Sequence, residues 1–315
     1  MWPAQTVTGA VRGMILDVPG SMLRLLGGSH CSHMRSKEPA MTYDRVPTWH
    51  AVQTVLAADL ACAVEDFDRP GVVVVAAADR PGRRAFPLHR SALRMVTTGR
   101  GVVVSCPPEH VRRVRALLET LPRDHIIAAN TLARLAAVVA ADGQELHGPY
   151  PNSVCWPAGF QPAGPPAGIT IQVLQGPQVS HLYQYPGFDH ALAYQTGGHR
   201  PDVLAAAAYC AGEVIGVAGA SADSDVIWQV GVDVRAAHRG RGIGRAVVSR
   251  VTEAIFAAGR VPHYAHAVAN LPSARLALSL GYRPAWVEVY TRAIQPGRAE
   301  GDQVEGADQC SLPRA

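Results

Sequence analysis

The sequence predicts a mixed α/β fold in which a second α/β domain precedes the domain that carries the functional motifs. Short apolar runs with strand character alternate with longer runs of helical spacing along most of the chain. With 315 residues, of which 48% are hydrophobic, the chain has enough apolar material to bury one large core or two ordinary ones. A Pro- and Gly-rich stretch between the two halves predicts a domain boundary.

We therefore expect five segments along the chain. The first 45 residues are weakly patterned, and the last segment is polar and rich in glycine, which favours disorder. The predicted segments are a disordered leader (1–45), an N-terminal α/β accessory domain (46–150), a linker (151–168), a second domain (169–293) and a disordered tail (294–315).

The N-terminal half contains helical and strand-like runs but no motif with recognisable chemistry. Helical spacing of apolar residues and a Pro-Pro-Glu-His start indicate its helices, and valine-rich runs indicate its strands. The predicted elements are helices at 49–65, 107–121 and 126–141, and strands at 72–76 and 101–106.

The pattern is clearer in the second half. A Ser-Ala-Asp-Ser-Asp stretch (221–225) has the residues of a hairpin turn, and Gly259 and Gly281 follow helical runs as stop signals. The predicted elements are strands at 169–174, 204–209, 213–220, 226–234, 261–268 and 285–291, and helices at 188–194, 242–258 and 272–280.

A glycine-rich loop, Arg-Gly-Arg-Gly-Ile-Gly-Arg (239–245), lies between a predicted strand and a predicted helix. It matches neither a Walker loop nor a Rossmann fingerprint, because Arg245 stands where both need glycine. Glycines let a ligand approach the backbone closely, and the following helix directs its unpaired N–H groups to the same point. The loop thus favours phosphate binding; a tight turn with solvated arginines is the alternative.

Together with its surroundings, this loop resembles the GNAT superfamily of acyl-CoA-dependent N-acyltransferases. The matching elements are a strand, the 221–225 hairpin, the strand VIWQVGVDV, the loop, its helix, the strand VPHYAHAV and the segment ANLPSARLALSLGYRPAWVEVY. The continuous resemblance covers about 205–292, and it implies a mostly antiparallel mixed sheet flanked by helices. It leaves open whether the N-terminal half is a degenerate copy of this fold or an accessory cap.

The resemblance implies an acyl-CoA site, with acetyl-CoA or another acyl-CoA as co-substrate and no metal. The strand edge would pair with the pantetheine arm, and the Val232 N–H would polarise the thioester carbonyl. Asn270 and Ser273 would face the cofactor arm, although a helix N-cap is an alternative role for Asn270. The residues implied to bind the cofactor are Val232, Asp233, Val234, Arg239, Gly240, Arg241, Gly242, Ile243, Gly244, Arg245, Asn270 and Ser273.

The family's acid and base positions are not filled in the usual way. Ala277 stands where many relatives carry a tyrosine, and Trp228 where some carry a carboxylate. By strand alternation Asp233 faces away from Val232, which favours a structural role for its side chain. We expect Tyr264 to act as the acid and His266 as the base, on one face of a neighbouring strand. Two further histidines, His181 and His190, lie in the segment that covers the acceptor site in relatives.

Composition excludes several classes of function. The net charge of +4 is too mild for a nucleic-acid binder, and the six scattered cysteines have no ligand spacing for zinc. No apolar run approaches the ~20 residues of a membrane span. We expect a cytoplasmic protein with no nucleic-acid or membrane partner; a homodimer is left open.

The predicted activity is acetyl transfer from acetyl-CoA to a small-molecule primary amine, directly within a ternary complex. Two alternatives remain open at this point. The chain could bind acyl-CoA without catalysis, or it could use the same co-substrate for decarboxylation or O-acylation.

Overall fold

The computed structural model describes residues 46–85, 93–195 and 200–294. All of these residues belong to one compact unit, Thr42–Ala315. The predicted leader (1–45) and all but the first residue of the predicted tail (294–315) lie outside the described residues.

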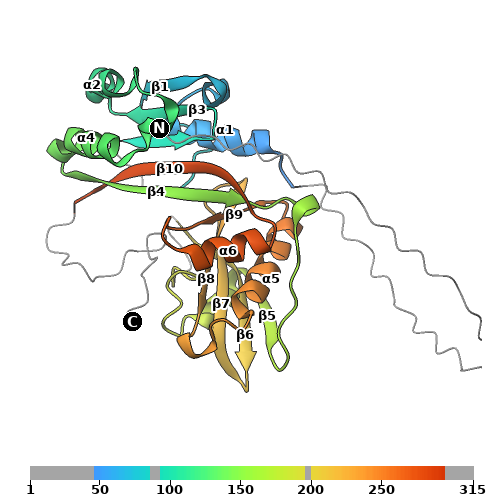
Figure 1. Cartoon of the computed structure of the whole chain (residues 1–315). Coiled ribbons are helices and arrows are strands. Elements are labelled where there is room, and N and C mark those ends of the chain that lie inside the picture. Colours follow the sequence, from blue (N-terminus) through green and yellow to red (C-terminus); the bar gives the residue numbers. More distant parts are fainter. Residues whose placement is uncertain (1–45, 86–92, 196–199, 295–315) are drawn as a thin grey trace, which may run out of the picture. The chain divides into compact units, whose positions relative to one another are not determined.

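In the described part of the chain, ten strands form a single mixed sheet (Figure 1). Its order is β1-β3-β2-β10-β4-β9-β8-β7-β6-β5, and the β1–β3 and β8–β9 pairs are parallel while the other pairs are antiparallel. The mostly antiparallel sheet that the resemblance implied is therefore confirmed. The strands are β1 (Gly71–Ala76), β2 (Arg94–Thr97), β3 (Gly101–Cys106), β4 (Gln144–Val154), β5 (Thr170–Gln175), β6 (Asp202–Cys210), β7 (Glu213–Ser221), β8 (Ile227–Val234), β9 (Val261–Ala265) and β10 (Arg283–Ala293).

Helices cover the sheet. The α-helices are α1 (Trp49–Leu60), α2 (Pro108–Leu118), α3 (Arg123–Ile126), α4 (Ala129–Val139), α5 (Ile243–Ala257) and α6 (Leu271–Ser279). Short 3-10 turns are η1 (Val64–Asp68), η2 (Ala140–Asp142), η3 (Pro157–Gly159), η4 (Gly176–Leu182) and η5 (Ala236–His238).

Strands β4 and β10 join the two halves of the chain. β4, from the N-terminal half, pairs with β9, and β10, from the end of the second half, pairs with β2 and β4. Figure 1 shows β4 and β10 running side by side across the middle of the sheet. Residues 151–154, predicted as the start of a linker, are thus the end of a central strand, because the proline and glycine content of this stretch concealed its pairing.

The rest of the predicted linker packs along α5. The Ala163 N–H donates to Ser249 Oγ at 2.9 Å, and the Phe160 ring lies edge-on to the Phe256 ring at 5.5 Å. Near the start of the helix, Pro166 is the closest neighbour of a Cβ placed on Gly242. This stretch therefore runs from one end of α5 to the other.

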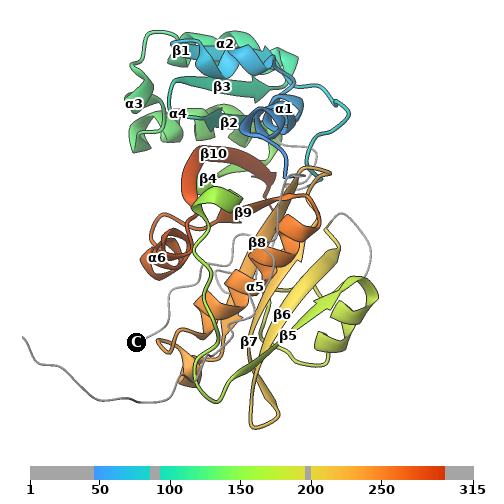
Figure 2. The same cartoon turned by 90° about the vertical axis from the view of Figure 1, so that its right-hand side faces the viewer.

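Helix α5 forms the core of the second half. The helix packs against β6, β7 and β8 (Figure 2), and its apolar i+4 series, Ile243, Val247, Val251 and Ile255, is buried in this core. Burial of each of these side chains stabilises the fold by about 1.5–3 kcal/mol. Together they hold α5 against the sheet.

On the opposite face of the sheet, residues 188–192 lie directly on two strand glycines. A Cβ on Gly219 would be 1.8 Å from the Ala191 carbonyl oxygen, and one on Gly231 would be 1.7 Å from the His190 carbonyl oxygen. The predicted helix at 188–194 is wrong: these residues form a turn, in which the Ala191 and Leu192 N–H groups donate to the Phe188 carbonyl. Backbone packing on the glycines takes the place of a helix.

A network of four buried charges connects α1, β2 and β10. The Arg84 guanidinium donates to Asp59 Oδ2 at 2.5 Å and to Glu288 Oε2 at 2.9 Å, and Arg94 lies 3.8 Å from both acids. Burial by itself would raise the pKa of Glu288, but Arg84 and Arg94 outweigh it and hold the pKa below its ordinary value. Two positive and two negative charges therefore neutralise one another inside the molecule.

We expect Glu288→Gln to lower the free energy of unfolding at pH 7 by about 3–5 kcal/mol, because it leaves Arg84 buried without its full charge compensation. The folded-state pKa of Glu288 is depressed, so its contribution is complete above the pKa of the unfolded chain, about 4.3. It is lost as the pH falls through the lower folded-state pKa. Urea unfolding at pH 7 and at decreasing pH measures the difference, which should narrow in acid.

Glu213→Gln is the matched control, since Glu213 is exposed at the start of β7. If Glu288→Gln lowers the free energy of unfolding at pH 7 by no more than the control does, the stabilising role of the network is contradicted.

We expect Gly231→Ala to lower the free energy of unfolding by about 1–3 kcal/mol or more, since the new methyl group must displace the His190 carbonyl. Gly164→Ala is the control: its Cβ would meet nothing within 4 Å, and its φ is not positive. Urea unfolding of the two variants checks the prediction. Equal free energies of unfolding would show that the 188–192 turn can shift to make room for the methyl group without destabilising the protein.

Candidate functional site

The parallel pair β8–β9 stops halfway along β8. Residues Ile227–Val230 pair with Val261–Tyr264, and among the described strands the rest of β8 pairs with β7 alone. β9 continues on its other side with β4, as far as Ala265. The two strands thus part after Val230, which leaves one edge of residues 231–234 without a strand neighbour in the described sheet.

The glycine loop follows this open edge and leads into α5. Gly240 and Gly242 have φ values of 74° and 81°, which glycine adopts without strain. A Cβ on Gly240 would meet nothing within 4 Å, and one on Gly242 only Pro166 at 3.8 Å. Gly242 is the N-cap of α5, where no side chain caps the helix. The first N–H groups of α5 are therefore left for an external acceptor.

The third glycine of the loop has a packing role. A Cβ on Gly244 would lie 3.1 Å from Leu276 Cδ1 and 3.4 Å from Val234 Cγ2. The first turn of α5 thus sits close to both β8 and α6. A larger residue here would push the helix start away from the open strand edge.

Four arginines surround the loop and give it positive charge. Arg235 and Arg239 donate to the carbonyls of Val214 and Val234 at 3.0 Å, and Arg245 donates to the Ser279 carbonyl at 3.3 Å. Arg241 contacts His238 Nδ1 at 3.1 Å. Within the described part of the chain none of these arginines has a carboxylate partner, so their charge is available to an anion.

The side chains of the open strand segment alternate as predicted. Val232 and Val234 pack towards α5, whereas the Asp233 carboxylate lies on the opposite face and binds residues 190 and 191. The side chain of Asp233 is thus engaged within the protein. Its predicted part in cofactor binding is left to its backbone.

Asn270 and Ser273 lie at the start of α6 with Tyr264 beside them. The Asn270 side chain accepts the Ser273 N–H at 3.0 Å, so it caps α6, which is the alternative role that the sequence left open. Ser273 Oγ lies 2.9 Å from the Tyr264 hydroxyl, and Tyr264 is buried. The structure brings these three residues together next to the point where β8 and β9 part.

β9 ends at Ala265 rather than at residue 268, so the predicted strand is too long. His266 follows directly, and its N–H donates to the Pro151 carbonyl of β4 at 3.4 Å. The His266 Nδ1 atom contacts the Ala267 carbonyl at 2.9 Å. The predicted placement of Tyr264 and His266 on one face stays a prediction.

Two buried groups next to Tyr264 are held in their neutral forms. Burial raises the pKa of Tyr282 well above its ordinary value, and its hydroxyl lies 2.7 Å from Thr252 Oγ1. Burial also lowers the pKa of His263 well below its ordinary value, helped by Arg84 and Arg200, and its Nε2 lies 2.7 Å from Asn152 Oδ1. Both residues have packing roles.

Sequence reasoning missed a His–Asp pair next to the open strand edge. His190 Nδ1 lies 2.7 Å from Asp233 Oδ1, and the Asp233 carboxylate also accepts the N–H groups of His190 and Ala191. The two residues are 43 positions apart, so no spacing motif indicates the pair. The one available signal was the alternation of side chains along β8, which predicted that the Asp233 carboxylate lies on the face opposite Val232.

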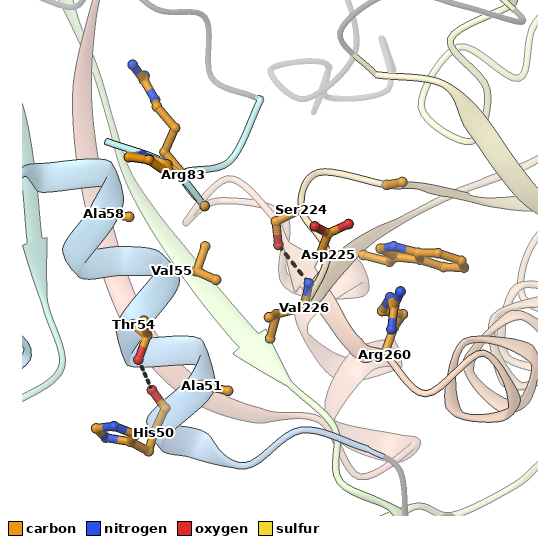
Figure 3. A pocket seen from close by; sticks show the side chains of 14 residues that line it. His50, Ala51, Thr54, Val55, Ala58, Arg83, Ser224, Asp225, Val226 and Arg260 are labelled. Atoms are coloured by element: carbon orange, nitrogen blue, oxygen red, sulfur yellow. Dashed lines mark hydrogen bonds between the residues drawn. The ribbon is translucent and has the colours of Figure 1, made fainter. Parts of the chain in front are cut away.

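A separate pocket of about 650 Å³ lies at the other end of β8 (Figure 3). Figure 3 shows Val55 and Ala58 of α1 opposite the turn that carries Ser224 and Val226. Trp228 lines this pocket, with the Arg260 guanidinium 5.9 Å from its ring centre. None of the predicted site residues lines the pocket.

None of the helices in the described part of the chain is both long and apolar enough to cross a bilayer.

Residues 172–282 match the family described as Acetyltransferase (GNAT) family. A search of curated proteins found no match. The matched range begins in β5 and ends one residue before β10, and it contains the open strand edge, the glycine loop, α5 and α6.

Solved structures with similarity to the chain include GCN5-related N-acetyltransferases from Kribbella flavida and Sphaerobacter thermophilus. The first is 22% identical with a TM-score of 0.39, over 52% of this chain and 64% of that chain. The second is 18% identical with a TM-score of 0.39, over 55% of this chain and 59% of that chain. A GCN5-related N-acetyltransferase-like protein from Streptococcus suis is 18% identical, with a TM-score of 0.37, over 51% and 67% of the two chains.

The chain thus spans less than two thirds of the Kribbella and Sphaerobacter proteins. At these identities and TM-scores the structural likenesses carry no functional conclusion. The family match stands independently of them and covers residues 172–282, so this part of the chain is similar to the Acetyltransferase (GNAT) family.

Proposed function

We propose that the chain is an acyl-CoA-dependent acyltransferase that transfers an acetyl group from acetyl-CoA to a primary amine of a small molecule. One observation carries the proposal: β8 loses its partner β9 after Val230, immediately before a positively charged glycine loop at a helix start. A thioester arm fits such an open edge as an added strand, and a pyrophosphate fits the loop.

The residues of the loop suit the phosphate end of the co-substrate. The open space at Gly240 and Gly242 lets an anion reach the backbone, and the first N–H groups of α5 point to the same place. Hydrogen bonds to a charged group are worth about 1.5–3 kcal/mol each, so three or four of them anchor a pyrophosphate. The four arginines add electrostatic attraction.

The open strand edge and α6 suit the acyl end. The Val232 N–H would polarise the thioester carbonyl, as an oxyanion-stabilising donor does. The Tyr264 hydroxyl, held by Ser273 at 2.9 Å, would give its proton to the departing thiolate. Transfer would be direct, because both substrates would be bound together before the amine attacks.

One feature favours a second candidate function. Ala277, which replaces the tyrosine of many relatives, is buried and offers no proton. An acyl-CoA binder without turnover, or an enzyme that decarboxylates or O-acylates the same co-substrate, would keep the same site. Release of CoA thiol that depends on an added amine favours N-acyl transfer over each of these.

We expect Gly242→Trp to weaken acetyl-CoA binding by several orders of magnitude, because the indole would occupy the space in which the pyrophosphate meets the loop backbone. Titration calorimetry with acetyl-CoA measures the affinity, and thermal unfolding checks that the variant folds. A strained left-handed residue costs roughly 1–2 kcal/mol, so the melting temperature should fall modestly.

Gly82→Trp is the matched control. Gly82 has the same φ of 81° and open surroundings, but it lies in the N-terminal half and far from the loop in sequence. Equal acetyl-CoA affinities of the two variants and the unaltered protein would refute the assignment of the loop.

A further inference from the structure

We propose that the His190–Asp233 pair is the base of the acyl transfer, with His190 taking the proton of the acceptor amine and Asp233 positioning the imidazole. The inference rests on the proposed function and deepens it, since it names the residue that faces the acceptor. It replaces His266, which the sequence had favoured for this role.

The hydrogen bonds of Asp233 define the state of the imidazole. Its carboxylate accepts from His190 Nδ1 at 2.7 Å, and it also accepts the N–H groups of His190 and Ala191 at 2.8 and 3.0 Å. A neutral imidazole that donates from Nδ1 has its lone pair on Nε2. The pair thus has the arrangement of a general base with an orienting carboxylate.

His190 sits over the part of β8 that β9 has left. Its carbonyl oxygen rests on the Cα of Gly231, and its N–H and ring bind Asp233, so the residue spans both neighbours of Val232. Val232 is the residue whose N–H would polarise the thioester. Successive strand residues are about 3.3 Å apart, which places His190 within one or two residues of the reacting carbonyl.

The acceptor can approach the thioester from one face of the sheet. On the other face the first turn of α5 and Leu276 of α6 lie against Val232 and Val234, where a single added Cβ on Gly244 would be tight. On the His190 face the imidazole side chain is 35% exposed, so a solute can reach it. The amine therefore meets His190 on its way to the open edge.

Among the described residues, further charged groups near the 188–192 turn come from the end of β8 and from the turn itself. Arg235 follows β8 and places its guanidinium 4.8 Å from the centre of the Phe188 ring, and Asp189 belongs to the same turn. The Tyr194 hydroxyl accepts the Phe188 N–H at 3.0 Å, and burial raises the pKa of Tyr194. Asp233 is the carboxylate in contact with the ring.

The proposed step balances as follows. The acceptor ammonium gives one proton to His190 Nε2, and the resulting amine attacks the thioester carbonyl. The C–N bond forms and the C–S bond breaks, with the electron pair of that bond leaving on the CoA sulfur. Tyr264 gives its proton to the departing thiolate, the nitrogen of the new amide releases its second proton to water, and Tyr264 regains a proton from water. His190 returns its proton to water, so the net products are the amide, the CoA thiol and one proton.

The test compares His190→Gln with His110→Gln. His110 is also paired with a carboxylate, its Nε2 lying 2.5 Å from Asp142 Oδ2, but it lies in the N-terminal half outside the family match. Acetyl-CoA affinity is measured by calorimetry for both variants, and CoA thiol release is followed across pH with the fastest of a panel of primary amines. We expect His190→Gln to keep acetyl-CoA affinity and to lose about 10²–10⁴-fold in kcat.

A second readout does not depend on turnover. Diethyl pyrocarbonate modifies neutral imidazoles, and mass spectrometry locates the modified histidines. We expect acetyl-CoA to protect His190 and to leave His110 unprotected. Acetyl-CoA binding without protection of His190, or unchanged kcat in His190→Gln, would overturn the base assignment alone; absence of acetyl-CoA binding to the unaltered protein would overturn the proposed function as well.

Discussion

Strand β9 has only five residues, and it pairs with β8 on one side and with β4 on the other. Because β4 holds its far end, β9 follows β4 when β8 turns aside, and the ladder between β8 and β9 ends at Val230 and Tyr264. This pairing of β9 with both β8 and β4 produces the open edge. It also places Tyr264 at the point where β8 and β9 part and lets α6 approach that point. Backbone N–H and C=O groups rarely stay unpaired in a sheet interior, so an edge of this kind suits an extended ligand.

The N-terminal half is therefore part of the framework of the site. β4 comes from that half, yet it borders β9, while β10 leaves the matched domain to pair with β2 and β4. The buried network of Asp59, Arg84, Arg94 and Glu288 connects α1 and β2 to β10 across the same junction. Removing one charge of such a buried network leaves its partners uncompensated and costs several kcal/mol, so the network links the two halves at this junction.

Local patterns predicted local structure well. The apolar i+4 series fixed α5, and the glycine spacing placed the loop between β8 and that helix, as the structure has it. Long-range pairing was beyond such patterns: residues 151–154 were predicted as the start of a linker, yet they end β4, whose partners are strands more than a hundred residues away. The 188–194 helix failed because the glycines of β7 and β8 and the Asp233 carboxylate, distant in sequence, determine that backbone. The predicted orientation of the Asp233 side chain, away from Val232, is confirmed. The domain boundary at 151–168 stays a prediction.

Amide hydrogen exchange in the presence of acetyl-CoA tests the account most directly, because it reads out the strand edge and the loop residue by residue. The account predicts slower exchange confined to residues 231–234 and to the first turn of α5, with little change in β1–β3. Protection around the α1 pocket in place of the loop, or no protection anywhere at saturating acetyl-CoA, would contradict it.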